Sequence, residues 1–326
     1  MKVAFLVYGC RLNQAEAEGW RQALEARGAT LVPPDAPEVD ALCAHTCAVT
    51  APAAREALRA LRAFRAKHPT VPLIVSGCAA ALLPPGLADL TLPHARKADW
   101  LAAVCDRLGL PHRPTEPAAP PARRRTRAAL VAQDGCDAFC AYCIVPHMRG
   151  APVSVPLADL LRRADALLAE GYPEIVLTGC NLALYRDPET GARLPELLAR
   201  LADLPRPGRF RLGSLEPCVA DDDAILRLIA ANPGRLCPFL HLPIQSGSDA
   251  LLRRMGRPYG ADRIRALLDR LCAALPHCGL GADWIAGLPG ETEADAAATL
   301  ALLRAYPFTG AHVFPYSRRP GTPAAD

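Results

Sequence analysis

Residues 131–150, VAQDGCDAFCAYCIVPHMRG, contain three cysteines within eight positions, Cys136, Cys140 and Cys143. A structural zinc site normally has four ligands, and disulfides use cysteines in pairs. Three thiolates can instead hold a metal centre that keeps one coordination position open for a second molecule. The preceding residues, AALVAQDGC at 128–136, change from apolar to polar and glycine-rich, which predicts a strand that ends at the cysteine segment.

The composition indicates a soluble globular protein. Its 326 residues are 51% hydrophobic and 21% charged, which is enough for two domains or one large barrel. No apolar run approaches the roughly 20 residues that span a bilayer, and the N-terminus turns acidic too early for a signal peptide. We therefore expect a cytoplasmic protein with no membrane contact. There the 13 cysteines would be reduced, and clustered ones would bind metal.

A proline-rich stretch at 110–127, LPHRPTEPAAPPARRRTR, divides the chain. We expect a first domain over 1–110, a linker over 111–127 and a second domain over 128–326. In the first domain, strands are predicted at 2–10, 39–47 and 71–78, with amphipathic helices at 14–28 and 51–68, which indicates an α/β fold with a parallel sheet. The predicted strands end at Cys10, Cys47 and Cys78, and strand ends of a parallel sheet share one edge, so these thiols should converge.

Six further strands are predicted after the linker, and helical segments such as 157–170 and 261–273 separate most of them. This rhythm predicts an open or partial (β/α)6 barrel of the TIM type, in which functional residues gather at the carboxyl ends of the strands. The predicted strands lie at 128–136, 174–181, 209–217, 238–247, 281–291 and 310–317.

Thiolates are the usual ligands of iron–sulfur clusters, and a 4Fe–4S cubane normally has four. With three, one iron keeps an open site. The spacing C-x3-C-x2-C, with Tyr142 before its last cysteine, resembles the radical S-adenosylmethionine (radical SAM) superfamily. The resemblance implies that S-adenosylmethionine (AdoMet) binds the open iron. One electron from the cluster then cleaves its sulfonium bond and yields a 5′-deoxyadenosyl radical.

By spacing alone, Cys10, Cys47 and Cys78 could either hold a second cluster or be unrelated buried thiols. Cys43 lies close to Cys47, which makes the set harder to define. The local sequences are more specific. YGCRLNQAEAE, HTCAVTAPAAREALR and SGCAA resemble the cysteine segments of the methylthiotransferases, radical SAM enzymes with an auxiliary 4Fe–4S cluster. The resemblance continues through HLPIQSGSDALLRRMGRPY and HVFPYSRRPGTPAA and covers essentially the whole chain.

Three branches of that family act on different substrates: isopentenyladenosine in tRNA, an aspartate of a ribosomal protein, and threonylcarbamoyladenosine in tRNA. GCRLNQ, with Leu12, and HVFPYSRRPGTPAA look most like the third branch. The resemblance then implies an enzyme that places a methylthio group at C2 of N6-threonylcarbamoyladenosine at tRNA position 37, next to the anticodon. The other two branches, and a truncated member that only binds clusters or RNA, remain alternatives.

The resemblance also implies two uses of AdoMet. A sulfur at the open iron of the auxiliary cluster (Cys10, Cys47 and Cys78) is methylated by one molecule. A second molecule, at the cluster held by Cys136, Cys140 and Cys143, supplies the radical. The implied cofactors are thus two 4Fe–4S clusters and AdoMet. The implied partners are tRNA, an electron donor such as flavodoxin or ferredoxin, and a sulfur source, and we expect a monomer.

Residues at the ends of the predicted barrel strands are candidates for contact with AdoMet, with loop capping as the alternative for each. They are Tyr142, Gly179, Asn181, Ser214, Glu216 and Gln245. His241 is a further candidate at the barrel mouth. Gly287 and Gly290 are expected to shape a tight loop close to the cofactor.

Charged residues flank the cysteine motif. They are Asp134 and Arg149. Arg149 has three open roles: to offset cluster charge, to contact a tRNA phosphate, or to form a plain salt bridge. A basic run in the linker could either contact phosphates or be part of a solvated linker; it consists of Arg123, Arg124, Arg125 and Arg127. The net charge of +4 is weak evidence for a nucleic-acid partner.

The sequence departs from the family pattern at several points. It ends at Asp326, just after the sixth predicted strand, where family members normally continue into a small tRNA-binding β domain called TRAM; we expect that domain to be absent. His45 stands where the family usually has asparagine, and Cys180 where a small or β-branched residue is common. The segment GAPVSVP after Arg149 lacks the usual run of arginines.

Overall fold

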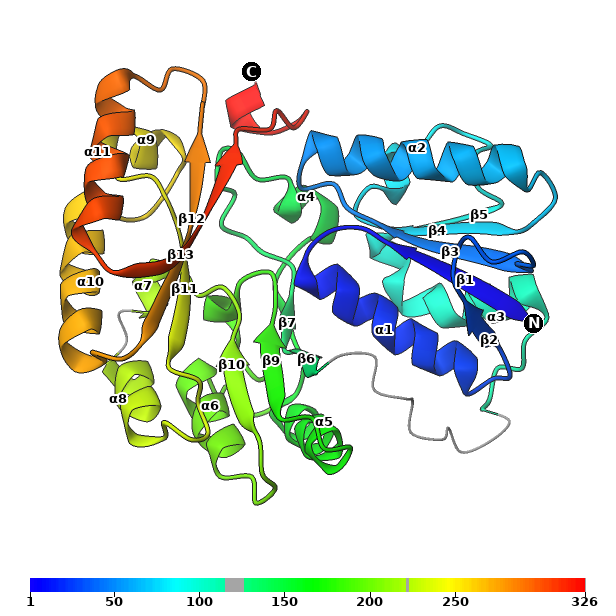
Figure 1. The fold of residues 1–326 in the computed structure, drawn as a ribbon, viewed down its shortest axis with the longest axis horizontal. Coiled ribbons are helices and arrows are strands. Elements are labelled where there is room, and N and C mark those ends of the chain that lie inside the picture. Colours follow the sequence, from blue (N-terminus) through cyan, green and yellow to red (C-terminus); the bar gives the residue numbers. More distant parts are fainter. Residues whose placement is uncertain (115–125, 221–222, 326) are drawn as a thin grey trace. The chain divides into compact units, whose positions relative to one another are not determined.

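The computed structural model describes residues 1–114, 126–220 and 223–325. Arg123, Arg124 and Arg125 of the basic run therefore lie outside the described residues. The described residues fall into two compact units (Figure 1). The N-terminal unit extends to residue 114 and also includes Ile144–Gly150, whereas the C-terminal unit contains residues 126–143 and those from 151 onward. Within the described part, every helix is too short or too polar to cross a membrane.

A five-stranded parallel sheet forms the centre of the N-terminal unit, in the order β2-β1-β3-β4-β5. Its strands are β1 (Lys2–Val7), β2 (Thr30–Val32), β3 (Ala41–Thr46), β4 (Leu73–Gly77) and β5 (Leu90–Pro93). Its helices are α1 (Arg11–Glu25), α2 (Ala51–Lys67), α3 (Trp100–Leu108) and α4 (Val145–Arg149), with short 3-10 turns η1 (Ala80–Leu82) and η2 (His94–Asp99). The chain runs from β1 to one side for β2 and to the other for β3, so the sheet has a topological switch point between β1 and β3.

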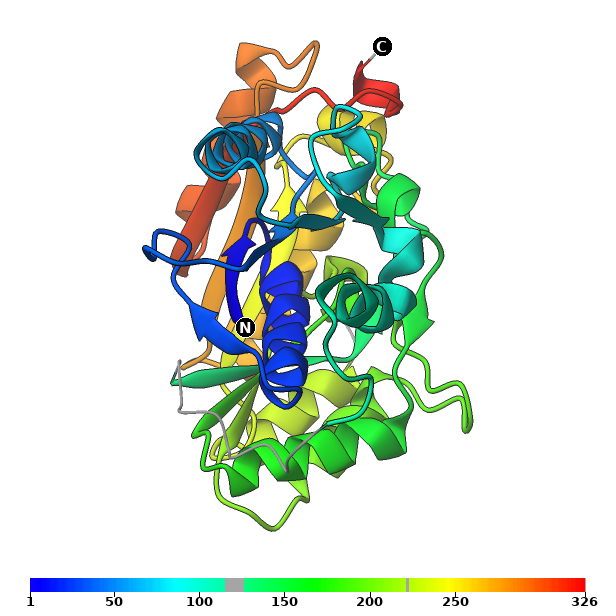
Figure 2. The ribbon, with the colours of Figure 1, turned by 90° about the vertical axis from the view of Figure 1, so that its right-hand side faces the viewer.

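Both faces of this sheet are buried, as a parallel sheet requires. Alternate residues of each strand pack on opposite faces: Phe5 lies against Trp100 of α3, whereas Ala4 belongs to the cluster around Leu61 of α2. Figure 1 and Figure 2 show α2 on one side of the strands and α1 and α3 on the other. The ring of Trp20 from α1 stacks on that of Trp100, with centroids 4.2 Å apart.

The sequence explains where α2 begins and ends. Thr50 is its N-cap and accepts a hydrogen bond from the Ala53 N–H at 3.3 Å, and Pro52 lies in the first turn, where its missing N–H costs nothing. Arg65 and Lys67 lie in the last turn, where positive charge complements the helix dipole. The sequence-based range of 51–68 differs from the observed helix by one residue.

The C-terminal unit contains six parallel strands in two sheets, β10-β9-β6 and β11-β12-β13. Isolated parallel bridges, Phe210 with Leu236 and Ser214 with His241, connect the two. The strands are β6 (Arg127–Val131), β9 (Glu174–Thr178), β10 (Arg209–Leu212), β11 (Phe239–Gln245), β12 (Gly279–Ala286) and β13 (Phe308–Pro315). An antiparallel pair, β7 (Gln133–Asp134) and β8 (Val153–Ser154), closes the segment that carries the cysteine motif.

Helices connect these strands in sequence, and their apolar sides share one core with the strands. They are α5 (Leu157–Ala169), α6 (Leu194–Ala202), α7 (Pro217–Ala220), α8 (Asp223–Ala231), α9 (Asp249–Arg254), α10 (Ala261–Ala274) and α11 (Glu293–Ala305), with the 3-10 turns η3 (Leu182–Leu184) and η4 (Pro323–Ala325). This arrangement confirms the expected α/β fold class with a parallel sheet followed by a partial six-stranded barrel.

Three features differ from the sequence-based expectation. Arg127, assigned to the linker, is the first residue of β6 and pairs with Glu174 at 3.0 Å. Residues 144–150 group with the N-terminal unit although they follow Cys143 directly. The edge strands β2 and β5 were not predicted, because strands of three and four residues carry too little periodicity. Helix α3 was not predicted either.

Glu174 at the start of β9 is a buried carboxylate that pairs with arginines on both neighbouring strands. Its partners are Arg127 of β6 and Arg209 and Arg211 of β10, at 3.0, 2.8 and 2.7 Å. Burial alone would raise the pKa of Glu174, but the hydrogen bonds and charges of these arginines lower it from 4.5 to about 2. The pairing therefore stabilises the fold fully at neutral pH, and this contribution is lost as the pH falls from 4.5 toward 2.

We predict that Glu174→Gln destabilises the C-terminal unit by about 2 kcal/mol at pH 7.5, because hydrogen bonds to three cations lose their charge. Thermal unfolding of the full chain, followed by circular dichroism, measures this. Asp165→Asn is the matched control, since the Asp165–Arg206 pair is exposed and should contribute little. Equal stability of Glu174→Gln and the unmodified chain would contradict the assigned role.

Candidate functional site

Three cysteines follow adjacent strands of the N-terminal sheet. Cys10 is the N-cap of α1 just after β1, Cys47 follows β3, and Cys78 follows β4. Cys47 and Cys78 are buried and Cys10 is exposed. Burial raises the pKa of Cys78, the charge and hydrogen bond of Arg149 lower it, and the charges of Cys47 and Cys10 raise it. The three thiols, predicted from strand ends, are thus close enough to interact.

Glycines allow the chain to turn sharply beside these thiols. Gly9 has φ of +107°, and a Cβ at this position would lie 2.6 Å from the Cβ of Cys47. Gly77 has φ of +93°, and its Cβ would lie 2.3 Å from the Thr46 carbonyl oxygen. Any side chain at these positions would clash with backbone or with a cysteine, so both places require glycine.

Arg149, in the last turn of α4, is buried against this set. Its Nε donates to Cys78 Sγ at 3.3 Å. Its Nη atoms donate to both carboxylate oxygens of Glu16, at 3.1 and 3.0 Å, and to Asn13 Oδ1 at 2.6 Å. Because this side chain is only 2% exposed, it forms a buried ion pair beside a thiol and is not available to a tRNA phosphate.

Glu16 connects Arg149 to His45. His45 Nε2 lies 2.9 Å from Glu16 Oε2, and its Nδ1 lies 3.0 Å from Ser76 Oγ. Burial would raise the pKa of Glu16, but the hydrogen bond from His45 and the charges of Arg149 and Lys97 hold it well below its usual range. The histidine that departs from the family pattern is therefore a partner of the carboxylate that holds Arg149.

The second set of three cysteines, Cys136, Cys140 and Cys143, lies on the loop between β7 and α4. Cys136 Sγ accepts from the Ala138 N–H at 3.5 Å, and the Cys143 N–H donates to the Cys140 carbonyl at 2.9 Å. Burial raises the pKa of Cys136, while hydrogen bonds from Ala138 and from the Asn181 side chain lower it. Phe139 has φ of +43°, a strained value for a bulky residue that is consistent with a loop shaped by its cysteines.

Two distant segments hold this loop in place. The Ala141 N–H donates to the Met255 carbonyl at 2.9 Å, and the Ala141 carbonyl accepts from the Ala324 N–H at 2.8 Å. The ring of Tyr142 packs against the buried residues Leu251, Met255 and Leu288. The loop therefore has backbone partners from residues more than 100 positions away.

Arg257 lies beside the second set of cysteines, as Arg149 lies beside the first set. Its Nη1 donates to Cys140 Sγ at 3.3 Å, and its Nη2 donates to the Pro243 carbonyl at 2.9 Å and to Glu216. Tyr259 donates to Glu216 at 2.8 Å and accepts from Arg257 Nε at 2.8 Å. Sequence reasoning did not single out Arg257 or Tyr259.

Five of the six residues predicted for AdoMet contact end or follow barrel strands, whereas Tyr142 lies on the cysteine loop. Gly179 is close to Gln133, since an added Cβ would lie 2.9 Å from the Gln133 carbonyl oxygen, and the Asn181 N–H donates to Gln133 Oε1 at 2.9 Å. Ser214 is exposed just after β10, and Gln245, with φ of +73°, ends β11. Gln133 is the organising residue that the sequence analysis missed.

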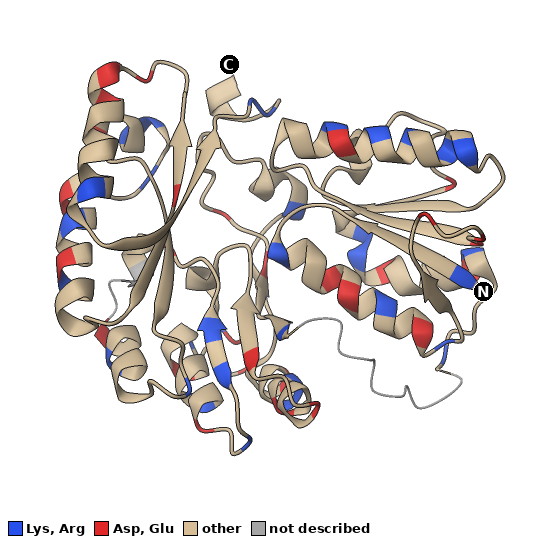
Figure 3. Ribbon diagram, in the orientation of Figure 1, with Lys and Arg blue, Asp and Glu red and all other residues tan. Residues whose placement is uncertain are grey.

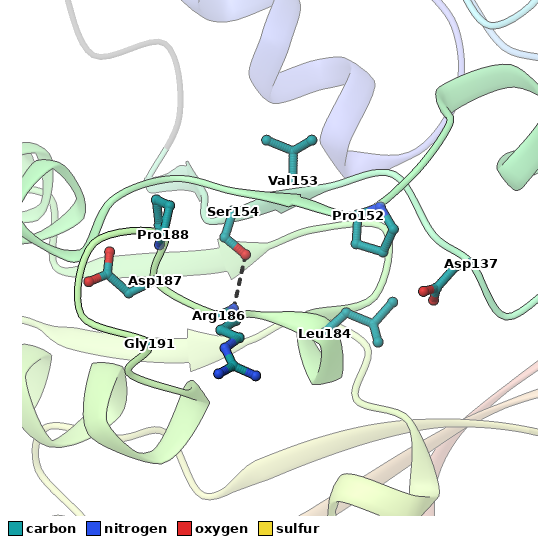
Figure 4. A pocket seen from close by; sticks show the side chains of 9 residues that line it. All are labelled: Asp137, Pro152, Val153, Ser154, Leu184, Arg186, Asp187, Pro188 and Gly191. Atoms are coloured by element: carbon teal, nitrogen blue, oxygen red, sulfur yellow. Dashed lines mark hydrogen bonds between the residues drawn. The ribbon is translucent and has the colours of Figure 1, made fainter.

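A surface pocket of about 720 Å³ lies beside the cysteine loop (Figure 4). Asp137 of the loop lines it together with β8 and the segment from Leu184 to Gly191, and Ser154 Oγ accepts from the Arg186 N–H at 3.0 Å. Its lining includes none of the six residues predicted for AdoMet contact. It therefore does not coincide with the predicted AdoMet-binding position.

The two sets of three cysteines suit the binding of iron–sulfur clusters. Each offers three thiols and a buried arginine that donates to one sulfur, which suits an anionic cluster. The other cysteines differ. Cys43 and Cys105 are buried in the core of the N-terminal sheet, and Cys218, Cys272 and Cys278 pack against the core of the C-terminal unit. These five thiols therefore lie in or against the apolar cores of their units.

Comparison with known proteins separates the chain into the same two regions, each with one set of three cysteines. Residues 130–303 match the radical SAM superfamily, and residues 2–92 match the uncharacterized protein family UPF0004. The tRNA-2-methylthio-N(6)-dimethylallyladenosine synthase of Cereibacter sphaeroides is 37% identical, over 100% of this chain and 78% of the relative. The threonylcarbamoyladenosine tRNA methylthiotransferase MtaB of Thermotoga maritima is 34% identical, over 98% and 75%. The chain belongs to the radical SAM tRNA methylthiotransferase family.

Solved structures share the fold at low identity. The radical SAM methyltransferase TsrM of Kitasatospora setae has a TM-score of 0.68 at 16% identity, covering 99% of this chain and 77% of that one. The radical SAM enzyme OxsB has a TM-score of 0.62 at 12% identity, covering 99% and 54%. The methylthiotransferases use AdoMet and two 4Fe–4S clusters, in agreement with the two three-cysteine sets.

We predict that anaerobic reconstitution gives about eight irons per chain, because each three-cysteine set holds one cubane. The triple substitution of Cys136, Cys140 and Cys143 by alanine should leave about four, and so should that of Cys10, Cys47 and Cys78. Iron and acid-labile sulfide assays measure this. Cys43→Ala is the control and should keep all the iron; about four irons in the unmodified chain would contradict the second site.

Proposed function

We propose that this methylthiotransferase places a methylthio group at C2 of N6-threonylcarbamoyladenosine at tRNA position 37. The single observation that carries the proposal is the pair of three-thiol sets, each with an arginine donating to one sulfur, in a chain that belongs to the tRNA methylthiotransferases. The threonylcarbamoyl substrate is favoured by Leu12 in GCRLNQ and by HVFPYSRRPGTPAA, which resemble that branch.

Each unit has a distinct part in this proposal. Cys10, Cys47 and Cys78 of the region 1–110 would hold the auxiliary cluster, and Cys136, Cys140 and Cys143 of the region 128–326 the radical SAM cluster, with residues 111–127 as a linker. When bound, these groups supply sulfur, a methyl group and the radical chemistry that an unactivated aromatic C–H bond requires. The protein holds the cofactors, orients the adenine and keeps water away.

Residues at the barrel strand ends would orient AdoMet. Tyr142, which lies on the cysteine loop and packs against Leu251, Met255 and Leu288, suits the adenine. Gly179 and Asn181 suit the amino end. Ser214, Glu216 and Gln245 complete the proposed set. Glu216 already accepts hydrogen bonds from Arg257 and Tyr259, so its carboxylate has a fixed orientation before any cofactor binds.

A second candidate substrate is isopentenyladenosine. Relatives named dimethylallyladenosine synthases are 35–37% identical, against 34% for the threonylcarbamoyladenosine enzyme of Thermotoga maritima. Identities this similar do not separate the two substrates. The two modified nucleosides differ at N6, where one carries a charged, hydrogen-bonding group and the other an apolar chain.

Nucleoside mass spectrometry of tRNA from a deletion strain distinguishes them. We predict loss of methylthio-threonylcarbamoyladenosine, with its unmethylthiolated precursor accumulating, and restoration by the wild-type gene. Cys140→Ala is the matched variant that should not restore it. Loss of the isopentenyl derivative alone would transfer the proposal to the second substrate, and an unchanged profile would refute both.

The proposed partners are tRNA, an electron donor such as flavodoxin or ferredoxin, and a sulfur source, in the cytoplasm. Helix α2 is the part of the chain proposed to contact the tRNA, and Figure 3 shows Lys and Arg positions along it, with an acidic position among them. Arg55, Arg59 and Arg62 are exposed and follow one another at the i, i+4 and i+7 spacing of one helix face. The helix dipole does not explain charges this far from the C-terminus. Burial and the charge of Glu56 raise the pKa of Tyr8, and the charge of Arg59 lowers it, so this part of α2 lies close to the strand end that carries Cys10.

We predict that the double charge reversal Arg59→Glu with Arg62→Glu weakens tRNA binding. It should also reduce the slope of log Kd against log salt by about two, one per lost phosphate contact. Fluorescence anisotropy across a salt series measures this. Arg162→Glu with Arg163→Glu, exposed on α5, is the matched control. Equal slopes for the α2 variant and the unmodified chain would show that α2 is a solvated face.

A further inference from the structure

Each three-thiol set has one sulfur that accepts a hydrogen bond from a buried arginine. Arg149 reaches Cys78 and Arg257 reaches Cys140, both at 3.3 Å. The side chains of Arg149 and Arg257 are 2% and 4% exposed. They lie in different units and come from different local sequences, MRG and GRP, so this shared arrangement is not a repeat of one motif.

Each arginine is also held by a carboxylate and a neutral partner. Glu16 and Asn13 hold Arg149, and Glu216 and Tyr259 hold Arg257. These contacts leave few orientations open to the guanidinium groups, so each N–H remains directed at its sulfur. A guanidinium stays charged under all ordinary conditions.

A positive charge and an N–H donor at a cluster thiolate favour the reduced cluster. Reduction adds one negative charge, and the arginine stabilises that charge more than it stabilises the oxidised state. Burial strengthens the effect, because buried charges are little screened by salt. A carboxylate near the same cluster has the opposite effect on the reduced state.

We propose that Arg149 and Arg257 are positioning residues that set the reduction potentials of the two clusters, and that Glu16 and Glu216 limit how far each potential is raised. This proposal rests on the assignment of the clusters to the two cysteine sets. It adds that the two potentials are set independently, each by its own arginine–glutamate pair.

The test is an EPR-monitored redox titration of the full chain with both clusters reconstituted. Addition of AdoMet identifies the signal of the radical SAM cluster, because only that signal should change. For Arg257→Met, we expect the reduced-to-oxidised ratio of that cluster at a fixed potential to fall about tenfold, a shift of about 59 mV for one electron. For Arg149→Met, we expect a downward shift of the other signal alone.

Substitutions of the two glutamates should shift the reduction potentials in the opposite direction. Glu16→Gln should raise the potential of the auxiliary cluster, and Glu216→Gln that of the radical SAM cluster, because each removes a negative charge. Arg149→Lys and Arg257→Lys keep the charge and should restore part of the shift. If a methionine variant fails to keep its iron, the lysine and glutamine variants still decide the question.

Buried or half-buried arginines without a sulfur partner are the controls. Arg65→Met removes a pair with Asp89, and Arg235→Met removes hydrogen bonds to carbonyls such as that of Leu204. Both should lower thermal stability and leave both potentials unchanged. Unshifted potentials in the Arg149 and Arg257 variants at full iron content would overturn the inference and leave the cluster assignment intact. Loss of iron from the unmodified chain would overturn the assignment itself.

Discussion

Parallel pairing of β1, β3 and β4 is the constraint on which the N-terminal unit depends. Parallel strands end at one edge, so residues that are 37 and 31 positions apart in the sequence follow neighbouring strands in space. Cys10 and Cys47 lie on either side of the switch point between β1 and β3, where such sheets usually bind ligands. The sheet can place thiols there because both its faces are covered by helices, which leaves the carboxyl edge for chemistry.

The C-terminal unit brings its three cysteines together in a different way. Its three cysteines come from one loop, which the β7–β8 pair closes, and Met255 and Ala324 hold its centre. Local spacing defines the cysteines, but backbone partners far along the chain define the shape of the loop. Glu216 and Arg257, which lie beside the loop, come from separate connecting segments. The barrel is therefore what makes a three-cysteine loop into a site.

Much of the fold was predictable from sequence, for physical reasons that can be assigned to particular elements. Helix α2 has a cap, an early proline and a basic last turn, and it was placed within one residue. The central strands are long and apolar. The short strands β2 and β5 escaped prediction because three or four residues show no period. The assignment of residues 144–150 to the second domain failed because which unit a short helix joins depends on packing and not on its position in the chain.

The sequence by itself determined the chemistry: six cysteines in two sets, the carboxyl-end placement of each, and the resemblance that names AdoMet. Only the tertiary structure decided which cations meet which sulfurs. Arg149 and Cys78 are 71 positions apart, and Arg257 and Cys140 are 117 apart, so no local pattern could pair them. The structure likewise gave His45 a partner in Glu16. Strand ends follow from backbone periodicity, which is local, whereas the partner of a buried charge depends on which side chains the whole fold brings within hydrogen-bond distance.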